Sequence, residues 1–135
     1  MAMFNWSDKY SVNVAEMDNQ HKELLNILNE LYDAMSARKS NEVLGTVITK
    51  LLNYTRKHFS IEEAYMQKFN YTGYPTQKRE HEFFIGKIQE FQKDLAAGKL
   101  TLSLDISTFL KNWLINHISV EDKKYSSVFN AKNLR

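Results

Sequence analysis

The sequence contains four long segments in which apolar residues recur every three or four positions, separated by short polar stretches. This spacing places apolar side chains on one face of an α-helix, so each segment predicts an amphipathic helix. The first is typical, with Leu24, Leu25, Leu28, Leu31, Tyr32 and Met35. With 4 glycines and 1 proline in 135 residues, the sequence is poor in the turn residues that a many-stranded sandwich or barrel needs. We therefore expect an all-α fold, an antiparallel up-down-up-down four-helix bundle.

Breaks between the apolar stripes predict where the helices begin and end within a single domain spanning residues 1–135. Residues 1–17 have no helical period but hold isolated aromatic and apolar residues, so we expect an N-terminal arm packed across the domain. Asp18 or Asn19, both good N-cap residues, would begin the first helix. The densest cluster of helix breakers, at residues 70–75, would end the second. The helices are then expected at about 18–37, 41–69, 76–97 and 103–129.

Composition excludes several classes of function. The chain has no cysteine, so any metal must be bound through nitrogen and oxygen atoms, and a cysteine nucleophile is excluded. Its 18 basic and 16 acidic residues nearly balance, which argues against a nucleic-acid or membrane partner. No apolar run has the length of a signal peptide or a membrane span. We therefore expect a soluble, cytoplasmic protein.

All four histidines fall on the apolar stripes, one in each expected helix: His21, His58, His81 and His117. A single histidine on an apolar face is more often a satisfied core residue than a ligand. If a stripe covers roughly three positions in seven, however, four independent histidines would all fall on stripes only about 3% of the time. Glu62 and Gln77 lie on the same rows. Buried polar groups are costly unless they satisfy one another or bind a metal, so we predict a metal site inside the bundle.

The residue types narrow the kind of metal site. Imidazole and carboxylate ligands suit iron, manganese, zinc or copper, and several of both in a bundle core are typical of two-metal carboxylate sites. A second carboxylate is needed beside Glu62, and Glu121 and Asp122 are the candidates. On a regular helix Glu121 would lie on the His117 face, with Asp122 about 140° away. Asp122 can reach the site only if the helix is locally unwound, which is frequent at functional sites.

The order and spacing of these residues resemble the signature of hemerythrins, specifically the single-domain bacteriohemerythrins. The matching pieces are His21, His58-Phe59-Ser60-Ile61-Glu62, His81 and His117-Ile118-Ser119-Val120-Glu121-Asp122. The similarity covers nearly the whole chain, including the arm around Trp6. It implies a non-haem diiron centre, two iron ions with an oxo or hydroxo bridge, that binds dioxygen reversibly.

The resemblance also implies a role for each residue. His21 and His58 would ligate the iron that takes up oxygen, and His81 and His117 would ligate the other. Glu62 and Asp122 would bridge the two, so the match favours Asp122 over Glu121. An apolar oxygen pocket, which would slow the loss of bound oxygen by excluding water and protons, would be lined by Phe59, Trp113, Leu114 and Ile118.

One position departs from the family's pattern. A histidine is expected four residues before His81, and this sequence has Gln77. The glutamine could be a weak ligand through its amide oxygen, or it could leave the position to water. We therefore expect this protein to hold one iron more loosely, or to autoxidise faster, than a Gln77→His variant.

The resemblance favours an oxygen-binding protein, used for oxygen transport, storage or delivery, over an enzyme, and we assign no catalytic residue. Three alternatives stay open: a diiron redox enzyme or detoxifying protein acting on peroxide or nitric oxide, an oxygen- or iron-sensing module, and a metal-free structural bundle. An open coordination position beside Gln77 favours the enzyme among these, because substrate chemistry needs one. Dioxygen is the expected partner, with an unspecified redox partner, and we expect a monomer.

Overall fold

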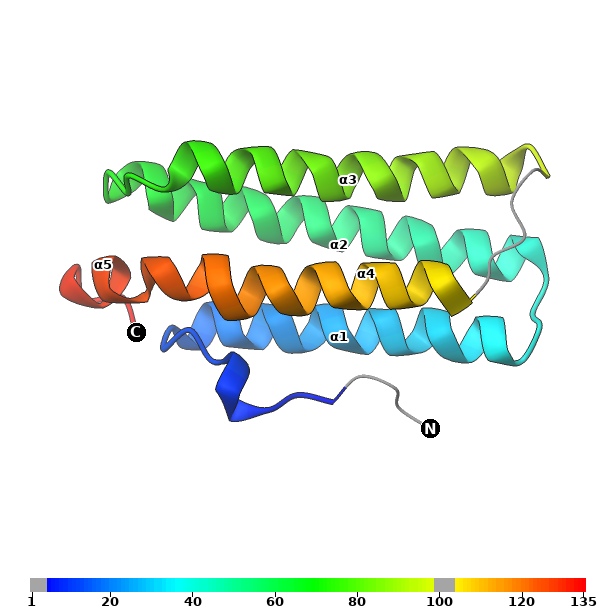
Figure 1. Ribbon diagram of the computed structural model, residues 1–135, viewed down its shortest axis with the longest axis horizontal. Coiled ribbons are helices and arrows are strands. Elements are labelled where there is room, and N and C mark those ends of the chain that lie inside the picture. The colour runs from blue at the N-terminus through cyan, green and yellow to red at the C-terminus, as the bar shows by residue number, and fades with distance from the viewer. Residues whose placement is uncertain (1–4, 99–103) are drawn as a thin grey trace.

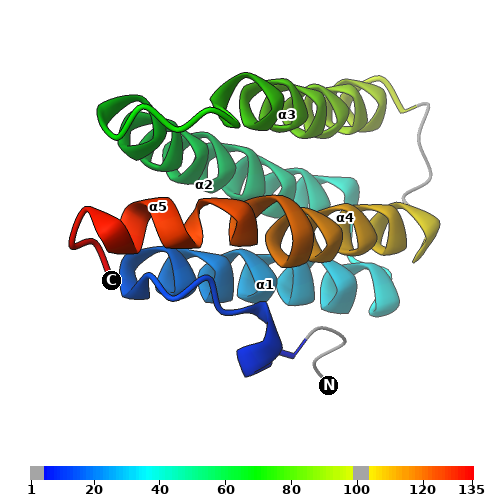
Figure 2. The ribbon, with the colours of Figure 1, turned by 60° about the vertical axis from the view of Figure 1, so that its left-hand side comes forward.

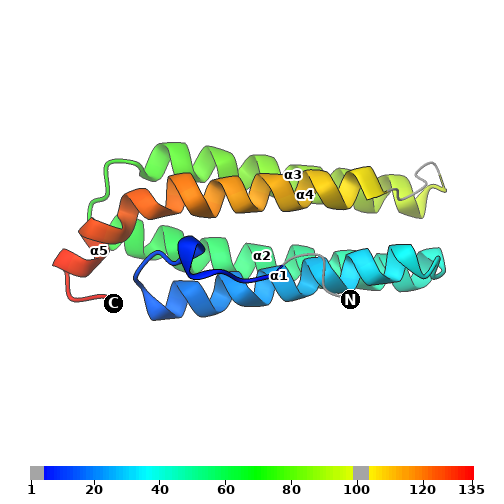
Figure 3. The same cartoon turned by 60° about the horizontal axis from the view of Figure 1, so that its bottom comes forward.

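The computed structural model describes residues 5–98 and 104–135, with side chains described outside 104–107. Four long helices in this part of the chain run antiparallel to their sequence neighbours (Figure 1): α1 Ala15–Ser36, α2 Asn41–Lys68, α3 Tyr74–Ala96 and α4 Leu104–Asn116. In Figure 3, α1 and α2 form one layer and α3 and α4 the other. The described residues contain no strand. The expected all-α, up-down-up-down bundle is therefore confirmed.

The N-terminal arm lies beside α1 (Figure 2) and contains the short helix η1, Asp8–Tyr10. Trp6 and Tyr10 pack against the main apolar core, and Val12 and Val14 are fully buried. These contacts position the arm across the bundle.

The first helix begins at Ala15, earlier than the expected start at Asp18 or Asn19. Val14 is the N-cap residue and contributes no side-chain capping bond. The carboxylate of Asp18 instead accepts hydrogen bonds from the Val12 amide at 2.9 Å and the Ser11 hydroxyl at 2.6 Å. The N-cap expectation is wrong because Asp18 satisfies the backbone of the arm, not the first amides of the helix.

The other helix ends follow local backbone chemistry. Before α2, the Ser40 hydroxyl accepts a hydrogen bond from the Val43 amide at 3.3 Å, as an N-cap residue does. The third helix begins at Tyr74, ahead of the expected residue 76, because Pro75 fits a first helical turn, where its missing N–H costs nothing. Gly98 follows α3 with a φ of 68°, a conformation that favours glycine. The expected start of the last helix, residue 103, lies outside the described residues.

The last helix is not one continuous α-helix over 103–129. After α4 the chain forms a π-helical turn, η2 His117–Glu121, and a 3₁₀ turn, η3 Asp122–Tyr125, before α5 Ser126–Ala131. The local unwinding that Asp122 requires is therefore present.

Two apolar clusters fill the interior, with the polar candidate residues between them. The larger contains Leu24, Leu51, Phe84 and Leu114, and the smaller contains Met17, Met66, Tyr125 and Phe129. On α2, Leu44, Ile48 and Leu52 are buried, whereas Val43 is 42% exposed. None of the described helices is long and apolar enough to cross a bilayer.

Candidate metal centre

The structure brings all six sequence-predicted ligands together in the bundle interior, in two overlapping groups. One group is His21, His58, Glu62 and Asp122, and the other is Glu62, His81, His117 and Asp122. Within each group, the candidate ligand atoms lie within 4.8 Å of one another, and all six residues are buried. Both groups contain both carboxylates, so the arrangement offers two neighbouring metal positions with two shared ligands.

Each carboxylate faces histidines of both groups. Asp122 Oδ2 lies 3.1 Å from His21 Nε2, and its Oδ1 lies 3.1 Å from His117 Nε2. Glu62 Oε1 lies 3.1 Å from His58 Nε2 and 3.5 Å from His81 Nε2. Carboxylates in this position can bridge two metal ions.

The π-helical turn explains how Asp122 reaches the site. Its backbone N–H donates to the carbonyl of His117, five residues earlier, where an α-helix would bond four residues earlier. The wider turn brings residues five apart onto one face. Asp122 is accordingly fully buried beside His117, whereas Glu121 is half-buried and contacts Lys124.

Three of the four imidazoles are oriented by a hydrogen bond on the side away from the centre. Gln20 Oε1 lies 2.6 Å from His58 Nδ1, Glu63 Oε2 lies 2.8 Å from His81 Nδ1, and Glu80 Oε1 lies 3.0 Å from His117 Nδ1. Such partners fix the ring and leave Nε2 as the atom facing a metal. Each ring accordingly presents Nε2 to the carboxylates.

The sequence analysis did not identify these three partners. Each partner lies on the helix before that of the histidine it contacts, directly beside a candidate ligand: Gln20 is next to His21, Glu63 next to Glu62, and Glu80 next to His81. From that position its side chain reaches the histidine of the following helix. A polar residue adjacent to a buried ligand is thus the signal that could have found them.

The buried polar atoms of the six residues are better placed to bind a metal than to form hydrogen bonds with one another. His21 Nδ1, Glu62 Oε1 and Asp122 Oδ2 have no hydrogen-bond partner among the described residues, although imidazole nitrogens lie 3.1 Å from both carboxylate oxygens. His81 Nε2 and His117 Nε2 face each other at 3.1 Å. Buried polar atoms that converge while several lack a hydrogen-bond partner fit a metal-ligand set, and imidazole nitrogen and carboxylate oxygen suit iron.

Electrostatics of the metal-free protein favour two protonated imidazoles. Burial disfavours the charged form of His21, but Asp122 and Glu62 outweigh burial and raise its pKa to about 9. Burial also disfavours the charged form of His117, but this effect is outweighed by Asp122, Glu62 and Glu80, which raise the pKa of His117 to about 9. Burial lowers the pKa of His58 despite the nearby Glu62.

The two carboxylates stay ionised in spite of their burial. Burial opposes ionisation of Glu62, but the facing rings of His58 and His21 hold its pKa well below its usual value. Burial and Glu62 oppose ionisation of Asp122, yet His117 and His21 lower its pKa. At neutral pH both buried carboxylates are therefore negatively charged and face the positively charged rings of His21 and His117.

Two neutral side chains donate hydrogen bonds to these carboxylates. The Tyr125 hydroxyl donates to Glu62 Oε2 at 2.6 Å, and the Gln77 amide nitrogen donates to Asp122 Oδ1 at 3.1 Å. Burial, Glu62 and Asp122 raise the pKa of Tyr125 well above its usual value, so it remains a donor. Gln77 is 1% exposed and its amide oxygen has no partner among the described residues.

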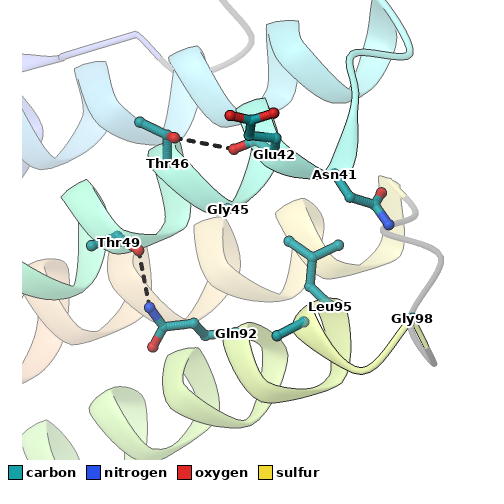
Figure 4. A pocket seen from close by; sticks show the side chains of 9 residues that line it. Asn41, Glu42, Gly45, Thr46, Thr49, Gln92, Leu95 and Gly98 are labelled. Carbon is teal, nitrogen blue, oxygen red and sulfur yellow. Dashed lines mark hydrogen bonds between the residues drawn. The ribbon is translucent and has the colours of Figure 1, made fainter.

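The residues expected to line an oxygen pocket lie beside the histidines of the second group. The Phe59 ring stacks on His81 with centroids 3.7 Å apart, and Trp113 stacks on His117 at 4.7 Å. Leu114 and Ile118 are each 1% exposed. A separate surface groove of about 660 Å³ lies between the start of α2 and the end of α3 (Figure 4) and shares no residue with this site.

Comparison with known proteins agrees with this geometry. The hemerythrin HHE cation-binding domain family matches residues 12–128. A bacteriohemerythrin from Methylococcus capsulatus is 33% identical over 97% of this chain and 100% of its own length. A myohemerythrin from Sipunculus nudus is 36% identical over 89% of this chain and 88% of its own length. A crystal structure of wild-type hemerythrin superposes with a TM-score of 0.89 at 32% identity, covering 94% of this chain and 98% of that chain.

Proposed function

This chain belongs to the hemerythrin family, and on that premise we propose that it binds dioxygen reversibly at a diiron centre inside the bundle. The observation that carries the proposal is the pair of buried ligand groups that share Glu62 and Asp122. Two metal ions with two common carboxylates are what such a pair can hold. When bound, the iron pair supplies redox chemistry toward dioxygen.

We assign the ligands by group. His21 and His58 would hold the iron that takes up oxygen, His81 and His117 would hold the other, and Glu62 and Asp122 would bridge them. The burial of all six and the convergence of Nε2 atoms on the carboxylates support this assignment.

Gln77 takes the place of a family ligand in this proposal. Its amide nitrogen donates to Asp122, which leaves the amide oxygen as an unpartnered acceptor inside the site. That geometry supports a weak oxygen ligand over a position left to water.

The surrounding side chains orient the ligands and exclude water. Gln20, Glu63 and Glu80 fix three imidazole rings, and Tyr125 holds one oxygen of Glu62. The apolar wall of Phe59, Trp113, Leu114 and Ile118 would keep protons and water from the bound ligand. The burial of Phe59, Leu114 and Ile118 supports this role, as does the Phe59 ring, whose centroid lies 5.6 Å from that of His58.

A diiron redox enzyme acting on peroxide or nitric oxide is the second candidate, favoured by the weak ligand expected at Gln77. Repeated cycles of reduction, oxygenation and deoxygenation distinguish the two. An oxygen-binding protein returns to the same optical spectra over many cycles. Irreversible oxidation accompanied by peroxide turnover would instead identify an enzyme.

We further propose that the protein acts in the cytoplasm as a monomer. The near-neutral charge balance of the sequence supports a protein without nucleic-acid or membrane partners. Light scattering on a size-exclusion column tests the oligomeric state: a mass close to 15.9 kDa is expected, and twice that mass would contradict it.

A further inference from the structure

The apolar layer next to the histidines contains one polar side chain, Thr55. Neighbouring helices are antiparallel, so one level of the bundle contains residues that follow the histidine on α1 and α3 and precede it on α2 and α4. We consider the level three or four residues from each histidine, on the side of the C-terminal end of α1. We call the buried members of this set the distal layer; they are Leu24, Leu25, Thr55, Phe84 and Leu114. All five are buried, with Thr55 0% exposed. A hydroxyl group at this level requires an explanation.

The hydroxyl of Thr55 has no hydrogen-bond partner among the described residues. A helical threonine usually donates to the carbonyl four residues earlier, and Thr46 on the same helix does so, to Glu42 at 3.0 Å (Figure 4). Thr55 makes no such bond in this structure. A buried hydroxyl without a partner destabilises the fold, so its presence in an apolar layer indicates a ligand that pairs with it.

The distal layer also lies on the side of the histidines that the two carboxylates and Gln77 leave free. The opposite side of the histidines is filled by Glu62, Gln77 and Asp122, which lie four or five residues from the histidine of the same segment. Gln77 donates a hydrogen bond to Asp122, and Tyr125 donates one to Glu62. Thr55 precedes His58 by three residues and Phe59 by four, so its side chain lies on the same helix face, one turn away from both.

We infer that the Thr55 hydroxyl donates a hydrogen bond to the small ligand at the metal centre, an inference that rests on the proposed function. The ligand class is a diatomic or triatomic molecule that carries or acquires negative charge, such as dioxygen or azide. Both accept hydrogen bonds, and the other four members of the distal layer have no side-chain donor. Thr55 is thus a residue that sets ligand affinity.

Azide titration of the oxidised, iron-loaded protein, followed by absorbance, tests this inference in Thr55→Val and Thr55→Ser. Thr55→Val should weaken azide binding about 3- to 10-fold, the effect of losing one hydrogen bond. Thr55→Ser keeps the hydroxyl and should bind azide within about 2-fold of the wild type. Thr46→Val, on the exposed face of the same helix, is the matched control and should change nothing.

Thermal unfolding of the same iron-loaded variants without azide provides a readout independent of ligand binding. Thr55→Val should unfold at the same or a higher temperature, because it removes an unpartnered buried hydroxyl. Equal azide affinity in Thr55→Val and the wild type, or a lower unfolding temperature for Thr55→Val, would overturn the inference. Failure of the wild type to oxygenate reversibly would instead refute the proposed function, because azide binding does not require reversible oxygenation.

Discussion

Replacing Tyr125 with phenylalanine should destabilise the metal-free protein by removing one hydrogen bond to a buried carboxylate. The hydroxyl lies 2.6 Å from Glu62 Oε2, and both side chains are fully buried. The ring itself stacks on Phe129 with centroids 4.2 Å apart, a contact that phenylalanine preserves. The substitution therefore isolates the hydroxyl.

The size of the effect follows from the partners that remain. Without Tyr125, Glu62 Oε2 keeps, among the described residues, only the distant His21 Nε2 at 3.4 Å. Hydrogen bonds to charged groups contribute about 1.5 to 3 kcal/mol, and the complete burial here leaves no solvent to replace the lost donor. We expect a loss of about 2 kcal/mol in the free energy of unfolding, or roughly 1 M in urea midpoint at a typical denaturant slope.

Urea unfolding followed by circular dichroism measures this change, with Tyr65→Phe as the matched control. Tyr65 makes a similar 2.7 Å hydrogen bond to Glu16, but on the exposed surface. Loss of this hydrogen bond should change the free energy of unfolding by less than about 0.5 kcal/mol, because solvent replaces it. Equal unfolding midpoints for Tyr125→Phe and Tyr65→Phe would refute the reasoning.

Three further predictions concern the ligand set and its protons. Gln77→His should retain iron longer against a chelator and autoxidise more slowly than the wild type; equal retention and equal autoxidation rates would contradict a weak ligand at Gln77. Because the pKa of His21 and His117 is raised to about 9, their contribution to metal-free stability is complete below their ordinary value of 6.5 and is lost as the pH rises through 9. Urea midpoints should therefore fall between about pH 6.5 and 9, and a rise over that range would be inconsistent with these shifts. Metal ligation needs neutral imidazole, so iron uptake near pH 7.5 should release one proton from each of these two residues. Titration calorimetry in buffers of different ionisation enthalpy measures this release. Heats of iron binding that are the same in every buffer would exclude it.

The bundle and five of its six candidate ligands could be predicted because both depend on periodicity along single helices, whereas only the resemblance to hemerythrins favoured Asp122 over Glu121. Apolar spacing identifies the inward face, and His58 and Glu62 lie one turn apart on it. Once Asp122 is favoured, the unwinding before it is expected as well, since a regular helix would turn that carboxylate away from His117.

What escaped prediction depends on contacts between helices. The bonds from Gln20 to His58 and from Glu63 to His81 cross from one helix to the next, and their geometry is set by how the helices pack. The same holds for Tyr125, whose hydroxyl reaches Glu62 from a different helix. The start of α1 was predicted wrongly because Asp18 bonds to the arm, a tertiary contact that its N-cap propensity does not reveal.

Metal analysis combined with optical spectra during oxygen cycling tests the central claim most directly. The two ligand groups that share Glu62 and Asp122 predict about two iron ions per chain and a visible charge-transfer spectrum that returns after each deoxygenation. A colourless protein that is equally stable without metal, or a single iron per chain, would contradict the account.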